Sequence, residues 1–234
     1  MIHRINSIYR ATEGEGIFLG MPQVFVRYQG CDVGCLNCDS KDTWSFRGGK
    51  VLTTDMVLEQ CQKEGFGKSR QRVSITGGDP LDEQHQNSVL ELVLELKNQG
   101  AWINIEAAGD KYNKQIFDVV DFISFDVKTP STGVEANLNI LETVIDGHFE
   151  KIQIKSVVFD KEDFNFIKGL QNKYVEQLST RKIPWIITPV FNYGETYPMS
   201  RVEKIIEWND FNGSSFRVIS QQHKWIHGPN KKFV

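Results

Sequence analysis

Short strand-like segments alternate with helix-like segments along most of the chain, and this alternation limits the folds it can form. Strands are predicted over residues 22–28, 72–76, 101–106, 119–127, 151–158, 185–189 and 216–220. Helices are predicted between them, over 54–64, 86–98, 111–117, 135–145, 162–174 and 200–208. A capping box from Ser200 to Glu203 is expected to open the last helix. Such alternation builds a parallel α/β sheet, and about six βα units are too few for a closed eight-fold barrel, so we expect a partial barrel.

Length and charge exclude several classes of protein. The chain has 234 residues, and we expect residues 1–234 to form a single domain. Its formal net charge of −3 gives no broad basic surface, so no nucleic acid partner is expected. No stretch reaches the roughly 18 apolar residues of a membrane span, and the first residues lack the core of a signal peptide. We therefore expect no membrane association and a cytoplasmic location.

Three of the four cysteines lie close together in the sequence. Cys31, Cys35 and Cys38 have the spacing Cys-x3-Cys-x2-Cys, whereas Cys61 stands apart. This is no disulfide framework for a chain of this length, and clustered thiols indicate metal ligands. Three thiolates can hold three corners of a four-iron, four-sulfur cluster and leave one iron open for a small molecule.

A zinc site is the alternative reading of the same cysteines. A closed structural zinc site needs four ligands, so Cys61 or a histidine would have to supply the fourth. Cys61 falls on the apolar face of a predicted helix, where a free cysteine behaves as a small hydrophobic residue. The spacing therefore favours the iron–sulfur cluster.

The residues around the cysteines resemble a known family. The segment 13–16 reads Glu-Gly-Glu-Gly, and Cys38-Asp39-Ser40 follows the cluster spacing. Further matching islands are Gly77-Gly78-Asp79, Glu106, Asp126 to Pro130, Lys155, and Gln221 to Lys224. The cysteine spacing is that of the radical S-adenosylmethionine superfamily, and the whole set resembles the 7-carboxy-7-deazaguanine synthases. That family commonly has Gln in place of Glu13, Thr in place of Ser40 and Glu in place of Asp79.

The resemblance implies a fold, a reaction and its cofactors. The fold would be a partial (βα)6 TIM barrel with the cluster, on loop 30–40, at the carboxyl ends of the strands. A segment from about 210 to 234 would cap the substrate. The cofactors would be a 4Fe-4S cluster, S-adenosylmethionine and Mg²⁺. A 5′-deoxyadenosyl radical would take a hydrogen atom from 6-carboxy-5,6,7,8-tetrahydropterin, which would contract to 7-carboxy-7-deazaguanine and lose ammonia.

The resemblance also implies binding residues, although none is assigned a catalytic role. Arg27 would form a two-bonded fork with the pterin carboxylate, and Ser40 would bind magnesium through its hydroxyl. Without the resemblance, Arg27 reads as a solvated arginine and Ser40 as a turn serine. The pterin-binding residues would be Glu15, Arg27, Glu106, Gln221 and His223. The cofactor-binding residues would be Gly77, Gly78, Asp79, Asp39 and Lys128.

The expected partners are a small pterin substrate and an electron donor such as flavodoxin or ferredoxin, and we expect a homodimer. Two other functions remain open from the sequence. The first is an activase of glycyl-radical enzymes, which would share the cysteine spacing but act on a protein. The second is a non-catalytic zinc or iron–sulfur binding module. The sequence does not fix the donor, the downstream pathway, or the roles of Glu13, Lys128 and Lys155.

Overall fold

A computed structural model describes residues 1–192, 195–228 and 230–233. Their strands form one sheet in the order β3-β1-β2-β4-β5-β6-β7-β8-β9. From β2 onward each strand runs parallel to its neighbour, whereas β1 pairs antiparallel with both β2 and β3. The strands are β1 (Ile2–Thr12), β2 (Pro22–Tyr28), β3 (Lys50–Thr53), β4 (Arg72–Gly77), β5 (Trp102–Ala107), β6 (Phe122–Asp126), β7 (Ile152–Val158), β8 (Trp185–Pro189) and β9 (Arg217–Val218).

The sheet is open, with β3 at one end and β9 at the other, so the predicted partial barrel is confirmed. All the predicted strands are present, although β9 is shorter than the predicted 216–220. Strands β1 and β3 are not predicted from the sequence pattern. In β1 buried and half-exposed positions do not alternate regularly, and β3 has four residues, so neither gives a clear strand period.

The helices follow the strands as predicted, with differences at their ends. Helices α3 and α4 begin at Lys114 and Leu138, later than predicted, because Asn113 and Asn137 cap them through their side chains. The predicted capping box at Ser200 is wrong, since Pro198 is the N-cap of α7 and makes no side-chain cap. The helices are α1 (Thr54–Lys63), α2 (Gln86–Asn98), α3 (Lys114–Val119), α4 (Leu138–His148), α5 (Lys161–Lys173), α6 (Val175–Thr180), α7 (Met199–Phe211) and α8 (Gln222–His227).

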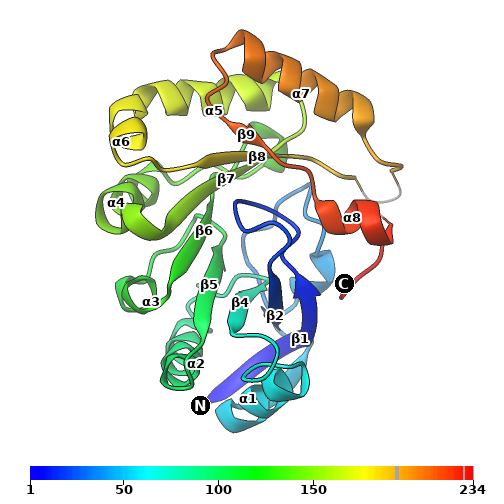
Figure 1. Cartoon of the computed structure of the whole chain (residues 1–234), viewed down its shortest axis with the longest axis vertical. Coiled ribbons are helices and arrows are strands. Elements are labelled where there is room, and N and C mark those ends of the chain that lie inside the picture. The colour runs from blue at the N-terminus through cyan, green and yellow to red at the C-terminus, as the bar shows by residue number, and fades with distance from the viewer. Residues whose placement is uncertain (193–194, 229, 234) are drawn as a thin grey trace.

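The two faces of the curved sheet have different surroundings. Figure 1 shows α2 to α7 around its outer side, and the loop between β1 and β2 inside its curve. On β5, Ile103 and Ile105 are fully buried in the apolar core, while Asn104 and Glu106 alternate with them and point the other way. No helix in the described part of the chain is long and apolar enough to cross a membrane.

The inner face carries a buried polar ladder across four neighbouring strands. Asn104 donates to Ser74 at 2.9 Å, and Ser124 donates to Asn104 at 3.2 Å. Gln153 donates to Ser124 at 2.7 Å and accepts from the backbone N–H of Ile17 at 2.8 Å. The loop between β1 and β2 is therefore fastened to the inside of the sheet, just below the strand ends.

An aromatic layer closes the other end of the inner face. The ring of Phe18, from the same loop, lies 5.0 Å from Trp102 and 4.7 Å from Phe122, both edge-on. The guanidinium of Arg72 stacks on Trp102 at 3.3 Å. Because these residues begin their strands, the layer seals the barrel at the end opposite the predicted site.

Candidate functional site

The cysteine loop follows the carboxyl end of β2. The N–H of Gly30 donates to Thr43 at 2.7 Å and the N–H of Cys31 donates to Trp44 at 3.1 Å. These bonds fold the loop back onto the short helix Lys41–Thr43. Cys31, Cys35 and Cys38 are free and partly exposed, and burial raises the pKa of the Cys31 thiol to about 11. A bound metal must therefore displace the proton of Cys31, as is usual for thiol ligands.

The three loop thiols are not gathered as closely as the sulfur ligands of a single zinc ion. Sulfurs on one zinc lie about 3.8 Å apart, given Zn–S bonds of about 2.3 Å. Across residues 1–192, 195–228 and 230–233, the one set of three potential ligand atoms within 4.8 Å of one another is Asp32, Asp79 and Asp110, so the thiols are spread more widely. Cys61 is fully buried in the apolar core and cannot serve as a fourth ligand. The prediction that Cys61 is a core residue is confirmed.

The Gly77-Gly78-Asp79 segment lies against the cysteine loop. A side chain at Gly78 would come within 2.1 Å of the carbonyl oxygen of Gly30, so only glycine allows this approach. The N–H of Asp79 donates to the same Gly30 oxygen at 2.9 Å. The carboxylate of Asp79 is fully buried and accepts from the N–H of Leu81 at 3.0 Å. Burial, then Asp110, raises the pKa of Asp79 to about 6.

Glu15 and Glu106 meet at one ammonium. Lys155 on β7 lies 2.7 Å from Oε2 of Glu15 and 3.2 Å from Oε2 of Glu106. Burial alone would raise the pKa of Glu15, but Lys155 and His223 outweigh it and hold that pKa at about 2. Burial alone would lower the pKa of Lys155, but the two glutamates raise it well above its usual value. Lys155 is thus held charged between two predicted substrate-binding residues.

The second oxygen of each carboxylate is also occupied. Asn104 donates to Oε1 of Glu106 at 2.7 Å, and Gln221 donates to Oε1 of Glu15 at 2.7 Å. Asn104 belongs to the polar ladder, which also holds the Glu15 loop through Gln153. Asn104 and Gln153 were not predicted as site residues. Both are polar residues within predicted strands, and their alternation with buried apolar neighbours is the signal that could have found them.

The C-terminal segment contacts both the cysteine loop and the loop between β1 and β2. Lys224 lies 3.1 Å from Asp39, and Gln221 donates to Asp39 at 3.3 Å. Burial opposes ionisation of Asp39, but Lys224 and Arg27 hold its pKa well below the usual range. A side chain at Gly14 would come within 2.2 Å of Nδ1 of His223, so the imidazole packs directly on the loop backbone.

Arg27 has a neutral partner. Its Nη2 donates to the hydroxyl of Tyr9 at 3.2 Å, and it forms no ion pair with a carboxylate among the described residues. Asp39 and Asp42 act on it through charge at longer range. A half-buried guanidinium without a carboxylate partner is available to an anionic ligand.

Two further predicted site residues, Lys128 and Ser40, make fewer contacts with the rest of the site. Lys128 pairs with Asp126 at 3.1 Å, at the carboxyl end of β6. The hydroxyl of Ser40 lies 3.7 Å from Sγ of Cys38, a contact in which either atom could donate. One hydroxyl is a sparse ligand set for magnesium, so other oxygen ligands would have to come from water and substrate.

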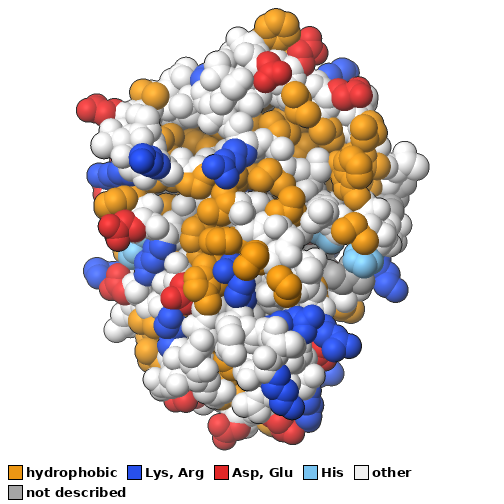
Figure 2. Space-filling view, in the orientation of Figure 1, with side chains coloured by type: hydrophobic (Ala, Val, Ile, Leu, Met, Phe, Trp, Pro, Cys, Tyr) orange, Lys and Arg blue, Asp and Glu red, His pale blue; other side chains and the backbone are white. Residues whose placement is uncertain are grey.

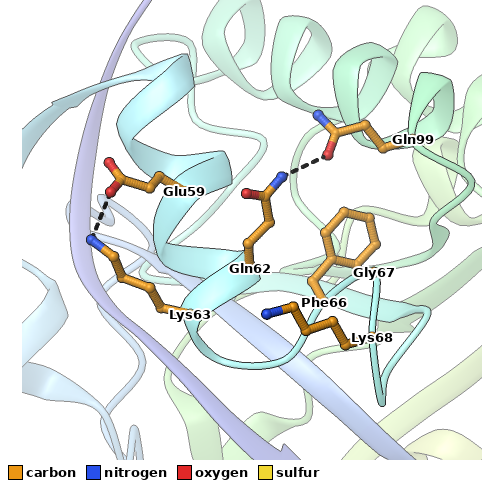
Figure 3. A pocket seen from close by; sticks show the side chains of 7 residues that line it. All are labelled: Glu59, Gln62, Lys63, Phe66, Gly67, Lys68 and Gln99. Carbon is orange, nitrogen blue, oxygen red and sulfur yellow. Dashed lines mark hydrogen bonds and ion pairs between the residues drawn. The ribbon is translucent and has the colours of Figure 1, made fainter.

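A cavity of about 440 Å³ lies elsewhere, between the ends of α1 and α2 (Figure 3). Its lining residues are Glu59, Gln62, Lys63, Phe66, Gly67, Lys68 and Gln99. None of these is a predicted site residue, and the cavity has no part in the site described above.

Comparison with known proteins settles the family. Residues 12–158 match the model of the 4Fe-4S single cluster domain. A 7-carboxy-7-deazaguanine synthase from Koribacter versatilis is 31% identical and covers 99% of this chain and 100% of its own. The chain belongs to the 7-carboxy-7-deazaguanine synthase family. A synthase from Thermoplasma acidophilum is 30% identical over 96% of this chain and 97% of its own.

Solved structures agree on the fold. QueE from Escherichia coli has a TM-score of 0.68 at 22% identity and covers 95% of both chains. SuiB from Streptococcus suis, bound to S-adenosylmethionine, has a TM-score of 0.55 at 13% identity over 82% of this chain and 45% of its own. Membership of the synthase family makes the chain a radical S-adenosylmethionine enzyme with a 4Fe-4S cluster. It does not favour the activase or the binding module.

Proposed function

We propose that the chain converts 6-carboxy-5,6,7,8-tetrahydropterin to 7-carboxy-7-deazaguanine with loss of ammonia. The observation that carries this proposal is the grouping of Glu15, Glu106 and Lys155, which Gln221 links to Asp39 of the cysteine loop. A pterin presents two N–H donors next to a carbonyl acceptor along one edge. Two carboxylates and one ammonium offer the complementary acceptors and donor.

The proposed substrate pose uses both charged ends of the site. Glu15 and Glu106 bind the N–H edge of the pterin, and Arg27 binds its carboxylate with two parallel hydrogen bonds. Gln221 and His223 close the site from the C-terminal side, which supports the proposal that the segment from about 210 to 234 caps the substrate. The polar ladder holds Glu106 and the Glu15 loop in place before substrate binds. Binding therefore needs little further ordering of these side chains.

The proposed cofactor site lies on the loops next to this pose. Cys31, Cys35 and Cys38 hold the cluster on loop 30–40, and Gly77, Gly78 and Asp79 bind S-adenosylmethionine with Asp39 and Lys128. A cluster bound there supplies the electron that cleaves S-adenosylmethionine reductively, which side chains cannot do. The contacts of Asp39 to Lys224 and Gln221 also support a role in anchoring the cap. Ser40 supplies one ligand to magnesium.

Further features of the proposal concern partners and setting. Residues 1–234 act as one domain, a flavodoxin or ferredoxin supplies electrons, and the enzyme works in the reducing cytoplasm as a homodimer. Figure 2 shows apolar side chains gathered over α7 and α8, which supports a protein contact on that face. The large exposed apolar residues of these two helices are Met199, Ile206, Phe211, Trp225 and Ile226.

An anaerobic assay tests the reaction. The reconstituted enzyme is incubated with 6-carboxytetrahydropterin, S-adenosylmethionine and a reductant, and the products are identified by mass. The expected product is 7-carboxy-7-deazaguanine, and it should be absent without pterin and with a Cys35→Ala variant. Recovery of unchanged pterin, with no 7-carboxy-7-deazaguanine formed by the reconstituted enzyme, would contradict the proposal.

A further inference from the structure

Lys111 lies among four carboxylates next to the cysteine loop. Its Nζ is 2.5 Å from Asp32, 3.2 Å from Asp110, 3.4 Å from Asp79 and 3.5 Å from Asp82. Lys111 lies in the loop between β5 and α3, at the carboxyl ends of the strands, and its side chain is 18% exposed. No sequence motif contains Lys111, and the proposed reaction assigns it no role.

The four carboxylates come from three different loops. Asp32 lies inside the cysteine spacing, after β2, while Asp79 and Asp82 follow β4 and Asp110 follows β5. Strands β2, β4 and β5 are neighbours in the sheet. One ammonium therefore joins the loop that holds the cluster cysteines to the glycine-rich loop and to its own.

Lys111 balances the negative charge of buried carboxylates next to the cysteine loop. Asp79 and Asp82 are 0% and 4% exposed, and in the described residues Lys111 is the cation that pairs with them. Buried carboxylates without a cation would repel each other and the negatively charged cluster thiolates. Asp32, Asp79 and Asp110 could also suggest a metal site, but the Lys111 ammonium already lies within 3.4 Å of all three, and we assign no metal there.

We propose that Lys111 is a positioning residue that holds the cysteine loop against the Gly77-Gly78-Asp79 loop, and so shapes the S-adenosylmethionine site. This inference rests on the proposed cofactor role of that loop. Backbone bonds already join Gly78 and Asp79 to β2 and Gly30, but they fix only the start of the cysteine loop. Lys111 reaches past Cys31 to Asp32 and ties the part of the loop that backbone bonds to β4 leave free.

The test compares Lys111→Met with Lys111→Arg, which keeps the charge, and Asp32→Asn, which removes the link to the cysteine loop alone. Lys114→Met is the matched control, because Lys114 is 72% exposed and pairs with Asp118 on its own helix. Hydrogen exchange of peptides covering 30–40 and 77–85 is measured by mass spectrometry in the cluster-free chain and again after reconstitution. The dissociation constant for S-adenosylmethionine is measured by equilibrium dialysis on the reconstituted enzyme without pterin.

We expect Lys111→Met and Asp32→Asn to exchange faster in 30–40 and Lys111→Met to bind S-adenosylmethionine about tenfold more weakly, as loss of a charge-assisted contact predicts. Lys111→Arg should recover most of the affinity, and Lys114→Met should match the unmodified enzyme. Unchanged exchange and affinity in Asp32→Asn and Lys111→Met would overturn the proposal. Tighter binding in Lys111→Met would also overturn it, because Lys111 would then be a cation that competes for the cosubstrate site.

If Lys111→Met does not fold, Asp32→Asn decides, since Asp32 is 57% exposed and its loss leaves the buried pairs intact. Unchanged exchange of 30–40 in that variant would overturn the proposal. None of these measurements uses the pterin. A failure of the proposed pterin reaction would therefore leave them unaffected, and a failure of the Lys111 proposal would leave the product assay unaffected.

Discussion

Gln221 donates a 2.7 Å hydrogen bond to Glu15, although 206 positions separate the two residues in the sequence. The backbone N–H of Gln222 adds a 3.0 Å bond to the carbonyl of Gly14. The C-terminal segment thus completes the site that the first loop begins. Gln221 therefore adds a contact to Glu15 beyond its ion pair with Lys155.

Gln221→Ala should raise the apparent Michaelis constant for the pterin about tenfold, because a hydrogen bond to a charged group contributes roughly 1.5–3 kcal/mol. The constant for S-adenosylmethionine should change less, because Lys224 still pairs with Asp39 after the 3.3 Å contact from Gln221 is lost. Gln222→Ala is the control, since Gln222 is exposed and contacts the loop through its backbone. If Gln221→Ala has as little effect as Gln222→Ala, the Gln221 side chain has no role and the segment contributes through its backbone.

Several motif residues could be placed from sequence because they lie at or just after the end of a predicted strand. Glu106 is such a residue, since it ends the predicted strand 101–106 and the strand ends of a parallel sheet meet at one edge. The contacts between sites could not be predicted, because Gln221 and Glu15 meet only through the tertiary fold. Gln153 and Lys111 belong to no motif, and their roles depend on which loop the barrel encloses. Strand β1 was not predicted because Ile2, Ile5 and Ile8 recur every three positions and not every second one.

Glu13→Gln should stabilise the protein above pH 7. Burial, then Glu106, raises the pKa of Glu13 to about 7, against about 4.5 when unfolded. Between these values the unfolded chain has lost a proton that the folded chain keeps, so stability falls as pH rises through this window. Above pH 7 the buried carboxylate is charged, and replacing it with a neutral amide should add up to about 3 kcal/mol.

The measurement for Glu13 is the free energy of unfolding in urea at pH 5 and pH 8 for both proteins. The difference should be small at pH 5 and large at pH 8. The amide can be accommodated because Oε1 of the neighbouring buried Gln23 has no hydrogen-bond partner among the described residues and can accept from it. If the difference in free energy of unfolding between the two proteins is the same at both pH values, the charge of Glu13 does not affect stability.

Cys38→Ala should abolish cluster assembly, whereas Cys61→Ala should leave it intact. Cys38 is a partly exposed thiol in the loop, and Cys61 is fully buried in the apolar core. Iron and sulfide content after anaerobic reconstitution, together with the brown absorbance, gives the result. Cys61→Ala should instead lower thermal stability, because it leaves a small cavity. Loss of iron in Cys61→Ala would make that residue a ligand.

Arg27→Ala should weaken pterin binding far more than S-adenosylmethionine binding. Arg27 has no carboxylate partner among the described residues, so its charge is free for the substrate carboxylate. The pterin Michaelis constant should rise roughly ten- to a hundred-fold, as expected for a charge-assisted pair. Tyr9→Phe removes only the hydroxyl that accepts from Arg27, and should have a much smaller effect. An unchanged pterin constant in Arg27→Ala would make it a solvated arginine.

The proposed magnesium site predicts an effect of Ser40 on one stage of turnover. Among the described residues the Ser40 hydroxyl has one weak contact, to Cys38 at 3.7 Å, so it can bind a metal whose other ligands come from substrate and water. Magnesium would then bind with the pterin and stabilise negative charge that builds on the ring. Ser40→Ala should slow formation of the deazapurine while leaving 5′-deoxyadenosine formation largely unchanged, and Ser40→Thr should be nearly neutral because it keeps the hydroxyl. The two products are quantified in parallel, with and without a chelator. If the ratio of the products is the same in Ser40→Ala and after chelation as in the untreated enzyme, Ser40 and magnesium have no role in ring contraction.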